Sequence, residues 1–284
     1  MNWWRTLGVV TLAAVVAGCV ESKTVVKVKK DGSGTLALEE YFSPQMTSMM
    51  EGMSGVMQQA IAGGSNATAG AQAAAKPPDA MAMFSDQLEK KTKEFGKDIV
   101  LVSKEPKSNA AGWKGYVATY SFKNIAALRV PTGGTDMGGG PGASEEKPKE
   151  GYAFQFTPGA AASLKVIPPP KKAKKEASAD KPAATPEGPG GDQMAAMMAP
   201  MLAGARVTIL LEVEGKITST NAKFKNGDNQ VVLMDVPMDK LVGNPAAMKL
   251  VSSKAPDQDE KIMNLNIPGI QIEDPAKTLT IDFK

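Results

Sequence analysis

The sequence predicts an α+β fold: an antiparallel β-sheet domain with a few helices packed on one face, interrupted by long disordered insertions. Apolar and polar residues alternate along several segments, most clearly over Val207–Val213, and this period of two indicates strands with one buried face. Gly, Asn and Asp residues separate several of these segments, which is typical of antiparallel hairpins. Helical periodicity is confined to a few short stretches.

The first 18 residues are predicted to be a lipoprotein signal peptide. Arg5 supplies the positive charge that precedes the apolar stretch Leu7–Ala17. This stretch is eleven residues long, whereas a helix needs about 20 to cross a bilayer. It ends in the motif Val-Ala-Gly-Cys, with small residues before the cysteine, so we expect cleavage between Gly18 and Cys19 and a diacylglycerol on the Cys19 sulfur.

Cys19 is the single cysteine of the chain, which favours lipidation over a plain secretory signal or an uncleaved anchor. Two or three acyl chains, such as palmitate, hold a protein to a membrane far more firmly than one chain does. Val20 occupies the position where aspartate commonly retains lipoproteins at the inner membrane. The expected location is therefore the outer membrane, facing the periplasm, or the cell membrane where there is only one.

Composition excludes most catalytic designs. The chain of 284 residues carries a formal charge of +3 and has no histidine. The lack of histidine excludes Ser-His and Cys-His catalytic triads and histidine-ligated zinc sites. Acylation of Cys19 would leave no thiol. The small charge gives no reason to expect nucleic acid as a partner, and no cofactor or metal site is predicted.

Three low-complexity segments interrupt the predicted domain of residues 19–284. They span residues 62–80, 131–151 and 168–191, and are rich in Ala, Gly, Pro and Lys. Such segments bury too little apolar surface to offset the entropy lost on ordering the chain, so we interpret them as disordered insertions.

The predicted strands begin directly after the cysteine. A hairpin is expected with Val26 and Val28 on one strand, a turn at Asp31–Gly34, and Leu36 and Leu38 on the next. Further strands are expected at 99–102, at 114–122 with Tyr116, Ala118, Tyr120 and Phe122 on one face, at 152–156 with Tyr152, Phe154 and Phe156, and at 279–283 with Leu279, Ile281 and Phe283. The segments 206–214, 216–223 and 231–235 are predicted to form a three-stranded meander.

Four helices are predicted. The segment Pro44–Ile61 has methionines at helical spacing, and so has Gln193–Leu202. Ser85 is a candidate N-cap for a helix that ends at Gly96, and Asn244-Pro245 is typical of the start of a short helix.

The methionine stripe of the first helix is the candidate binding site of the sequence. It consists of Met46, Met49, Met50, Met53 and Met57. Methionine is flexible and adapts to varied apolar shapes, so the stripe could line a groove for a lipid or a partner helix. The same spacing also suits core packing, and thioethers alone could bind copper(I), which the lack of histidine disfavours.

A catalytic role is not expected. An enzyme would have to use carboxylates such as Asp235, Asp239, Asp257 and Asp259, and their spacing singles out no pair. The lysines at 171–181 are separated by proline and alanine, which is typical of a solvated linker rather than a phosphate site.

Three regions carry a resemblance to a known family. The lipoprotein motif with the Val-Lys-Val-Lys-Lys-Asp-Gly-Ser-Gly hairpin, the block Phe95–Leu101 with Gly115–Phe122 and Ile125, and the block Val213–Ala222 resemble bacterial lipoproteins of the LppM-like type. The resemblance implies a β-rich envelope domain, with a suspected role in lipid binding in some relatives, and no catalytic residues.

Two functions therefore remain in view for a membrane-anchored, non-catalytic envelope lipoprotein. The first is binding of a lipid or another apolar ligand. The alternative is a structural or assembly role through contacts with other envelope proteins.

Overall fold

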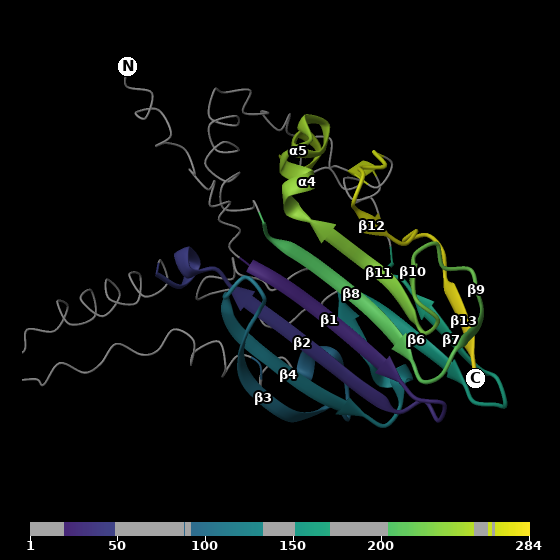
Figure 1. Cartoon of the computed structure of the whole chain (residues 1–284). Coiled ribbons are helices and arrows are strands. Elements are labelled where there is room, and N and C mark those ends of the chain that lie inside the picture. Colours follow the sequence, from purple (N-terminus) through teal and green to yellow (C-terminus); the bar gives the residue numbers. More distant parts are fainter. Residues whose placement is uncertain are drawn as a thin grey trace, which may run out of the picture.

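Two β-sheets form the body of the molecule in the computed structural model (Figure 1). The structure describes residues 20–48, 88, 92–132, 151–170, 204–252, 261–262 and 265–284. The signal peptide, Cys19 and most of the predicted insertions lie outside these residues. No helix among the described residues is long and apolar enough to cross a bilayer.

The larger sheet has eight strands, in the order β10-β11-β8-β1-β2-β4-β3, with β12 also paired to β11. Its strands are β1 (Val20–Val28), β2 (Gly34–Phe42), β3 (Val100–Ser108), β4 (Lys114–Phe122), β8 (Arg206–Val213), β10 (Lys225–Asn226), β11 (Gln230–Pro237) and β12 (Gln271–Ile272). All neighbours are antiparallel except β1 and β8, which run parallel. A parallel pair needs a long crossover connection, and here the chain returns only after β2 to β7.

The smaller sheet has five strands in the order β5-β6-β7-β13-β9. They are β5 (Arg129–Pro131), β6 (Gly151–Thr157), β7 (Ala162–Ile167), β9 (Ile217–Thr220) and β13 (Leu279–Phe283). Pro131 pairs with Gly151, so the two ends of the second predicted insertion belong to neighbouring strands. The insertion therefore connects the two strands of a hairpin.

The predicted hairpin after Cys19 is confirmed. Val28 of β1 pairs with Gly34 of β2, and the turn between them is closed by Asp31, whose Oδ1 accepts hydrogen bonds from the backbone N–H and hydroxyl of Ser33 at 2.9 and 2.7 Å. Gly32 has φ of +83°, which glycine adopts without steric cost. The turn is thus stabilised by its own residues, through the aspartate hydrogen bonds and the left-handed glycine.

The predicted meander is wrong in its middle strand. β8 pairs directly with β11, whereas β9 leaves the large sheet and pairs with β13 in the small one. The chain changes sheets at Gly215, which has φ of +93° and lies against the carbonyl oxygen of Lys284. Turn residues predict that a strand reverses, and they carry no information about which sheet receives the next strand.

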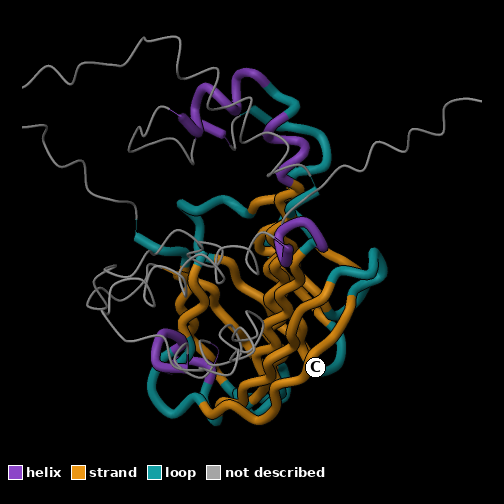
Figure 2. The backbone as a smooth tube through the Cα atoms, turned by 90° about the vertical axis from the view of Figure 1, so that its left-hand side faces the viewer, coloured by secondary structure: helices purple, strands orange, loops and turns teal. Residues whose placement is uncertain are grey.

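Buried side chains of both sheets form one core, so the sheets pack face to face (Figure 2). The predicted apolar faces of β4, β6 and β13 are confirmed, since their alternating residues belong to this core or pack against it. The largest fully buried side chains are Tyr120, Phe42, Phe283, Leu36, Ile125, Leu128, Leu164, Leu211, Leu233 and Ile281. Area removed from water at these positions supplies the main favourable free energy of folding.

The described helices are short, and the α+β class is confirmed. A 3-10 turn, η1 (Ile125–Ala127), precedes β5, while α4 (Met238–Val242) and α5 (Pro245–Ser252) follow β11. Figures 1 and 2 show α4 and α5 beyond the end of the strands. The inner face of the large sheet is covered in part by the small sheet.

Two of the predicted helix boundaries are visible. Oδ1 of Asn244 accepts hydrogen bonds from the backbone N–H groups of Ala246 and Ala247 at 3.0 and 3.1 Å, which confirms it as the cap of α5. Residues 92–95 are helical and Gly96 follows with φ of +126°, as expected for a residue that ends a helix. The candidate cap Ser85 and the predicted helix 193–202 lie outside the described residues.

Candidate functional site

The strand register defines two ends of the large sheet. At one end Val20 pairs with Phe42, Phe42 with Lys114, and Arg206 with both Glu21 and Pro237; we call it the proximal end, because it adjoins Cys19. At the distal end Val28 of β1 pairs with Gly34 and Val213. Eight residue steps of about 3.3 Å separate the two ends along β1, or roughly 26 Å.

The cysteine and the two methionine segments of the sequence all connect to the sheet at its proximal end. Cys19 precedes β1 there by one residue. The methionine segment 44–61 follows β2 after Ser43, and the second methionine segment, 193–202, ends four residues before β8. Sequence spacing alone could not reveal this arrangement, because it depends on the antiparallel pairing of β1 with β2 and the parallel pairing of β1 with β8.

The first methionine segment begins as predicted. Residues 44–48 are helical, and the buried Ser43 caps them, since its Oγ accepts a hydrogen bond from the backbone N–H of Met46 at 3.2 Å. Met46 is half-buried. The other four predicted groove residues, Met49, Met50, Met53 and Met57, lie outside the described residues, so the groove stays a prediction.

The turn between β3 and β4 also reaches the proximal end. It arches over the end of β2 toward β1 (Figure 1). Nδ2 of Asn109 donates a hydrogen bond to Oε2 of Glu21 at 2.7 Å. Oδ1 of the same asparagine accepts from the backbone N–H groups of Ala111 and Trp113 at 3.0 and 2.9 Å. Asn109 thus shapes the turn and ties it to the second residue after Cys19.

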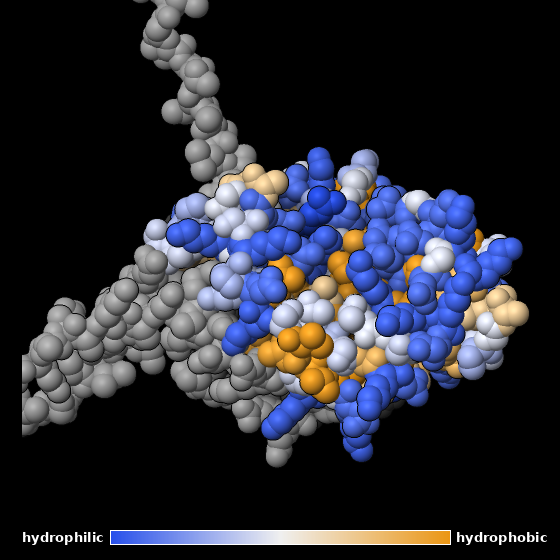
Figure 3. Space-filling model, turned by 60° about the horizontal axis from the view of Figure 1, so that its bottom comes forward, coloured by the Kyte–Doolittle hydropathy of each residue, from blue (hydrophilic) through white to orange (hydrophobic). Residues whose placement is uncertain are grey.

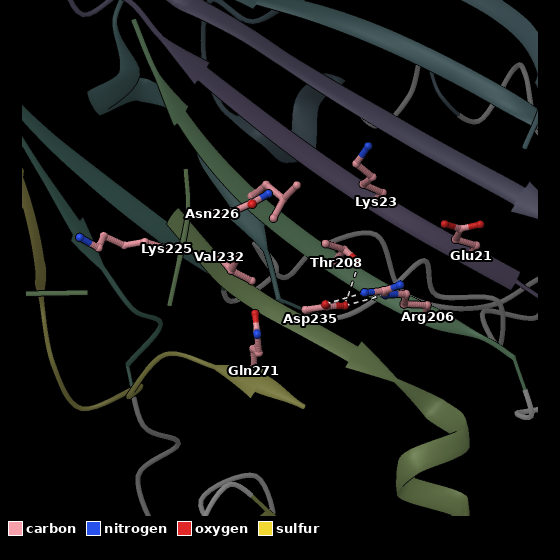
Figure 4. Close-up of a pocket in the computed structure, with 10 residues that line it drawn as sticks. Glu21, Lys23, Arg206, Thr208, Lys225, Asn226, Val232, Asp235 and Gln271 are labelled. Carbon is pink, nitrogen blue, oxygen red and sulfur yellow. Dashed lines mark hydrogen bonds and ion pairs between the residues drawn. The ribbon is translucent and has the colours of Figure 1, made fainter. Parts of the chain in front are cut away.

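A pocket of about 370 Å³ opens on the outer face of the large sheet. Figure 4 shows its side chains, which rise from β1, β8, β10, β11 and β12. They are Glu21, Lys23, Arg206, Thr208, Leu210, Lys225, Asn226, Val232, Asp235 and Gln271. Only Asp235 among them is a candidate from the sequence. The polar residues of the pocket alternate along their strands as ordinary solvent-exposed residues do, so the sequence gives no signal for the others.

An ion pair dominates the pocket. Nε and Nη2 of Arg206 each donate to an oxygen of Asp235 at 2.7 Å, and the hydroxyl of Thr208 donates to the same carboxylate at 3.2 Å. The hydrogen bond with Asp235 raises the pKa of Arg206 above its ordinary value. Three donors thus engage the Asp235 carboxylate and hold it against β8.

Lys23, at the edge of the pocket, is paired with a carboxylate. Nζ of Lys23 lies 3.2 Å from Oε1 of Glu39, whose other oxygen accepts from the hydroxyl of Tyr41 at 3.1 Å. Burial, followed by the charge of Glu39, raises the pKa of Tyr41 to about 12. Such a surface is suited to a polar or zwitterionic group, and it differs from the apolar groove that the methionine spacing predicts.

A buried carboxylate outside the pocket has a structural role. Glu273 follows β12, its backbone N–H donates to the carbonyl of Leu233 at 3.1 Å, and its Oε1 accepts from the backbone N–H of Phe224 at 2.8 Å. Burial raises the pKa of Glu273. The pKa of Tyr152 is raised to about 12, mainly by burial and also by the nearby charge of Glu273. Glu273 therefore fastens β12 and the loop before β10 to the large sheet.

Of the four carboxylates considered for catalysis, the structure describes Asp235 and Asp239, and the charges of both act on Arg206. Asp235 is bound by Arg206, while Asp239 lies in the first turn of α4, 3.9 Å from Nζ of Lys240. Asp257 and Asp259 lie outside the described residues. Within the part of the chain that the structure describes, no three His, Cys, Asp or Glu side chains are grouped so that they could hold a metal ion.

Fold and site together define a two-sheet α+β domain with a polar pocket on its outer face. No protein-family model and no curated protein matches the sequence. Among solved structures, the chain is similar to the NMR structure of the folded domain of Mycobacterium tuberculosis LppM. The identity is 9% over 94% of this chain and 91% of that one, with a TM-score of 0.30, and a likeness at this level supports no functional argument.

Proposed function

We propose that the protein is a non-catalytic lipoprotein of the bacterial envelope, held to a membrane by acyl chains on Cys19, and that it binds a lipid or another apolar ligand. The observation that carries the proposal is the register of the large sheet. It places at the proximal end the described residues that adjoin Cys19 and the two methionine-rich segments, namely Val20, Ser43 and Arg206. A ligand that enters from a membrane would meet this end first.

Methionine side chains suit such a ligand. They have three rotatable bonds and a polarisable sulfur, so one surface can adapt to acyl chains of different shape. The polar outer pocket lies partly at the same end, since Glu21 and Arg206 line it. Apolar and polar binding surfaces would then be available for the two chemical parts of an amphipathic molecule.

Cys19→Ser tests the anchoring step. Because only the thiol accepts the diacylglycerol, we expect the variant to remain an uncleaved precursor that takes up no labelled fatty acid. Metabolic labelling and a mobility shift on gels measure both effects. A control variant, Ser22→Ala, keeps the thiol and should be labelled and cleaved normally; labelling of Cys19→Ser would contradict the proposal.

Methionine oxidation tests the binding step. Mild peroxide oxidises accessible thioethers to sulfoxides, so a ligand groove should be oxidised at Met49, Met50 and Met53 in the folded protein and protected by added lipid extract. Peptide mapping with and without lipid measures this. Core methionines would react only on unfolding, and surface methionines would react without lipid protection.

The edge strand β3 supports the alternative, an assembly role through protein contacts. Val100 and Val102 expose 59% and 62% of their surface. Figure 3, which brings the underside of the molecule forward, shows apolar areas among hydrophilic ones. A bulge between Leu101 and Ser103 interrupts the register there, and bulges discourage strand addition at sheet edges, so we place this function second.

A further inference from the structure

We infer that the proximal end of the large sheet lies in the headgroup region of the bilayer, with Trp113 at the interface, and that the distal end points into the aqueous compartment. This orientation rests on the proposed lipidation of Cys19. In addition to the lipid anchor, the turn Asn109–Trp113 beside the start of β1 would then contact the membrane.

The tether between the lipid and the sheet is short. One peptide bond joins Cys19 to Val20, and consecutive Cα atoms are about 3.8 Å apart. Val20 already pairs with Phe42, and Glu21 pairs with Tyr41 on one side and Arg206 on the other. The acylated residue would therefore adjoin a strand with a neighbour on each side, and acyl chains in the hydrocarbon would bring the proximal end to the membrane surface.

The Asn109–Trp113 turn lies beside the attachment point of the lipid. The 2.7 Å hydrogen bond from Asn109 to Glu21 holds the turn next to the start of β1. A surface that the lipid draws to the bilayer must include this turn, because Glu21 is only two residues from Cys19.

The side chains of this turn suit the membrane interface. Its tip consists of Ala110, Ala111 and Gly112, which are exposed and uncharged, followed by the half-exposed Trp113. Tryptophan is enriched where membranes meet water, because its ring is apolar while its N–H still finds a hydrogen-bond partner. The exposed Lys114 follows directly, and lysines near the surface are attracted to anionic lipids.

Among the described residues, no turn of the distal end has such an uncharged tip beside a tryptophan. Its exposed charged residues include Lys29, Lys30, Asp31, Glu214, Lys216, Asp228 and Lys284. Charges of both signs so close together favour water over the membrane interface, because moving them out of water costs solvation free energy. The proximal end also carries exposed charged side chains, among them Arg206, Asp239 and Lys240, so what distinguishes it is the uncharged tip of the Asn109–Trp113 turn.

Fluorescence tests this orientation directly. Cleavage removes Trp3 and Trp4, so Trp113 is the sole tryptophan of the mature chain. The lipidated protein, purified from membranes, is reconstituted into vesicles of phosphatidylcholine and phosphatidylglycerol with or without brominated acyl chains. We expect brominated lipid to reduce the emission of Trp113 to about half or less, as for an interfacial indole.

The control moves the reporter to the other end. In the double variant Trp113→Phe, Lys30→Trp, the sole tryptophan lies on the distal turn, and its emission should be the same in both kinds of vesicle. Circular dichroism establishes that the variant is folded, and the measurement on Trp113 itself needs no variant. Equal quenching at both ends, or none at Trp113, overturns the orientation.

Flotation of the same vesicles separates the two proposals. Protein that floats with the vesicles but shows no quenching of Trp113 overturns the orientation and leaves the anchoring intact. Protein that does not float overturns the anchoring and the orientation together. Flotation with quenching confined to Trp113 supports both.

Discussion

Leu211→Asp should unfold the domain or lower its free energy of unfolding by about 4 kcal/mol or more, the cost expected for an unpaired carboxylate in an apolar core. Leu211 is fully buried in β8, between Val26 of β1 and Val231 of β11. The loss would be a large fraction of the roughly 5–15 kcal/mol that stabilises a typical domain. Urea unfolding followed by circular dichroism measures it.

The neighbouring residue supplies the control. Glu212 faces the other side of the sheet, where its Oε1 lies 3.3 Å from Nζ of Lys27. Exposed ion pairs contribute little, so Glu212→Lys should cost less than about 1 kcal/mol. Similar losses for the two variants would show that β8 does not have one buried and one exposed face.

Gly115→Ala should destabilise the domain by about 1–3 kcal/mol, the range expected when atoms are added to a well-packed region. A Cβ at residue 115 of β4 would overlap the carbonyl oxygen of Glu40 and lie 2.7 Å from Cα of Tyr41. Both atoms belong to the backbone of β2, so no side-chain rotation relieves the contact. β2 and β4 would have to separate near the proximal end.

Gly159→Ala is the matched control, since its Cβ would lie 3.3 Å from the nearest atom, the carbonyl oxygen of Ala161 in the exposed β6–β7 connection. We expect a change within about 0.5 kcal/mol, as for surface substitutions in general. Thermal unfolding of both variants measures the difference. A Gly115→Ala variant as stable as Gly159→Ala would mean that the close approach of β2 and β4 is not required.

Most individual strands were predictable because their signals are local. Alternation placed Tyr120, Phe154 and Ile281 on buried faces, and all three are in the core. The side-chain period of two is a property of each strand alone, and one buried face is enough to impose it. The cap at Asn244 and the turn at Asp31 are local in the same sense, since each uses hydrogen bonds within three residues.

The partners of the strands were not predictable, because pairing is decided by contacts between residues far apart in the chain. β9 carries ordinary strand residues and joins the second sheet only because β13, about 60 residues later, offers it an edge. The parallel pairing of β1 with β8 joins Glu21 to Arg206 across 185 residues. No periodicity within either segment encodes it.

The candidate site divides in the same way. Sequence by itself determined the apolar stretch, the motif that ends in Cys19, the methionine spacing and the absence of histidine, because each follows from residue identity. Only the tertiary structure decided that β1, β2 and β8 meet at the proximal end, that Asn109 bonds Glu21, and that Arg206 binds Asp235. These contacts depend on strand register, which the packing of the whole core sets.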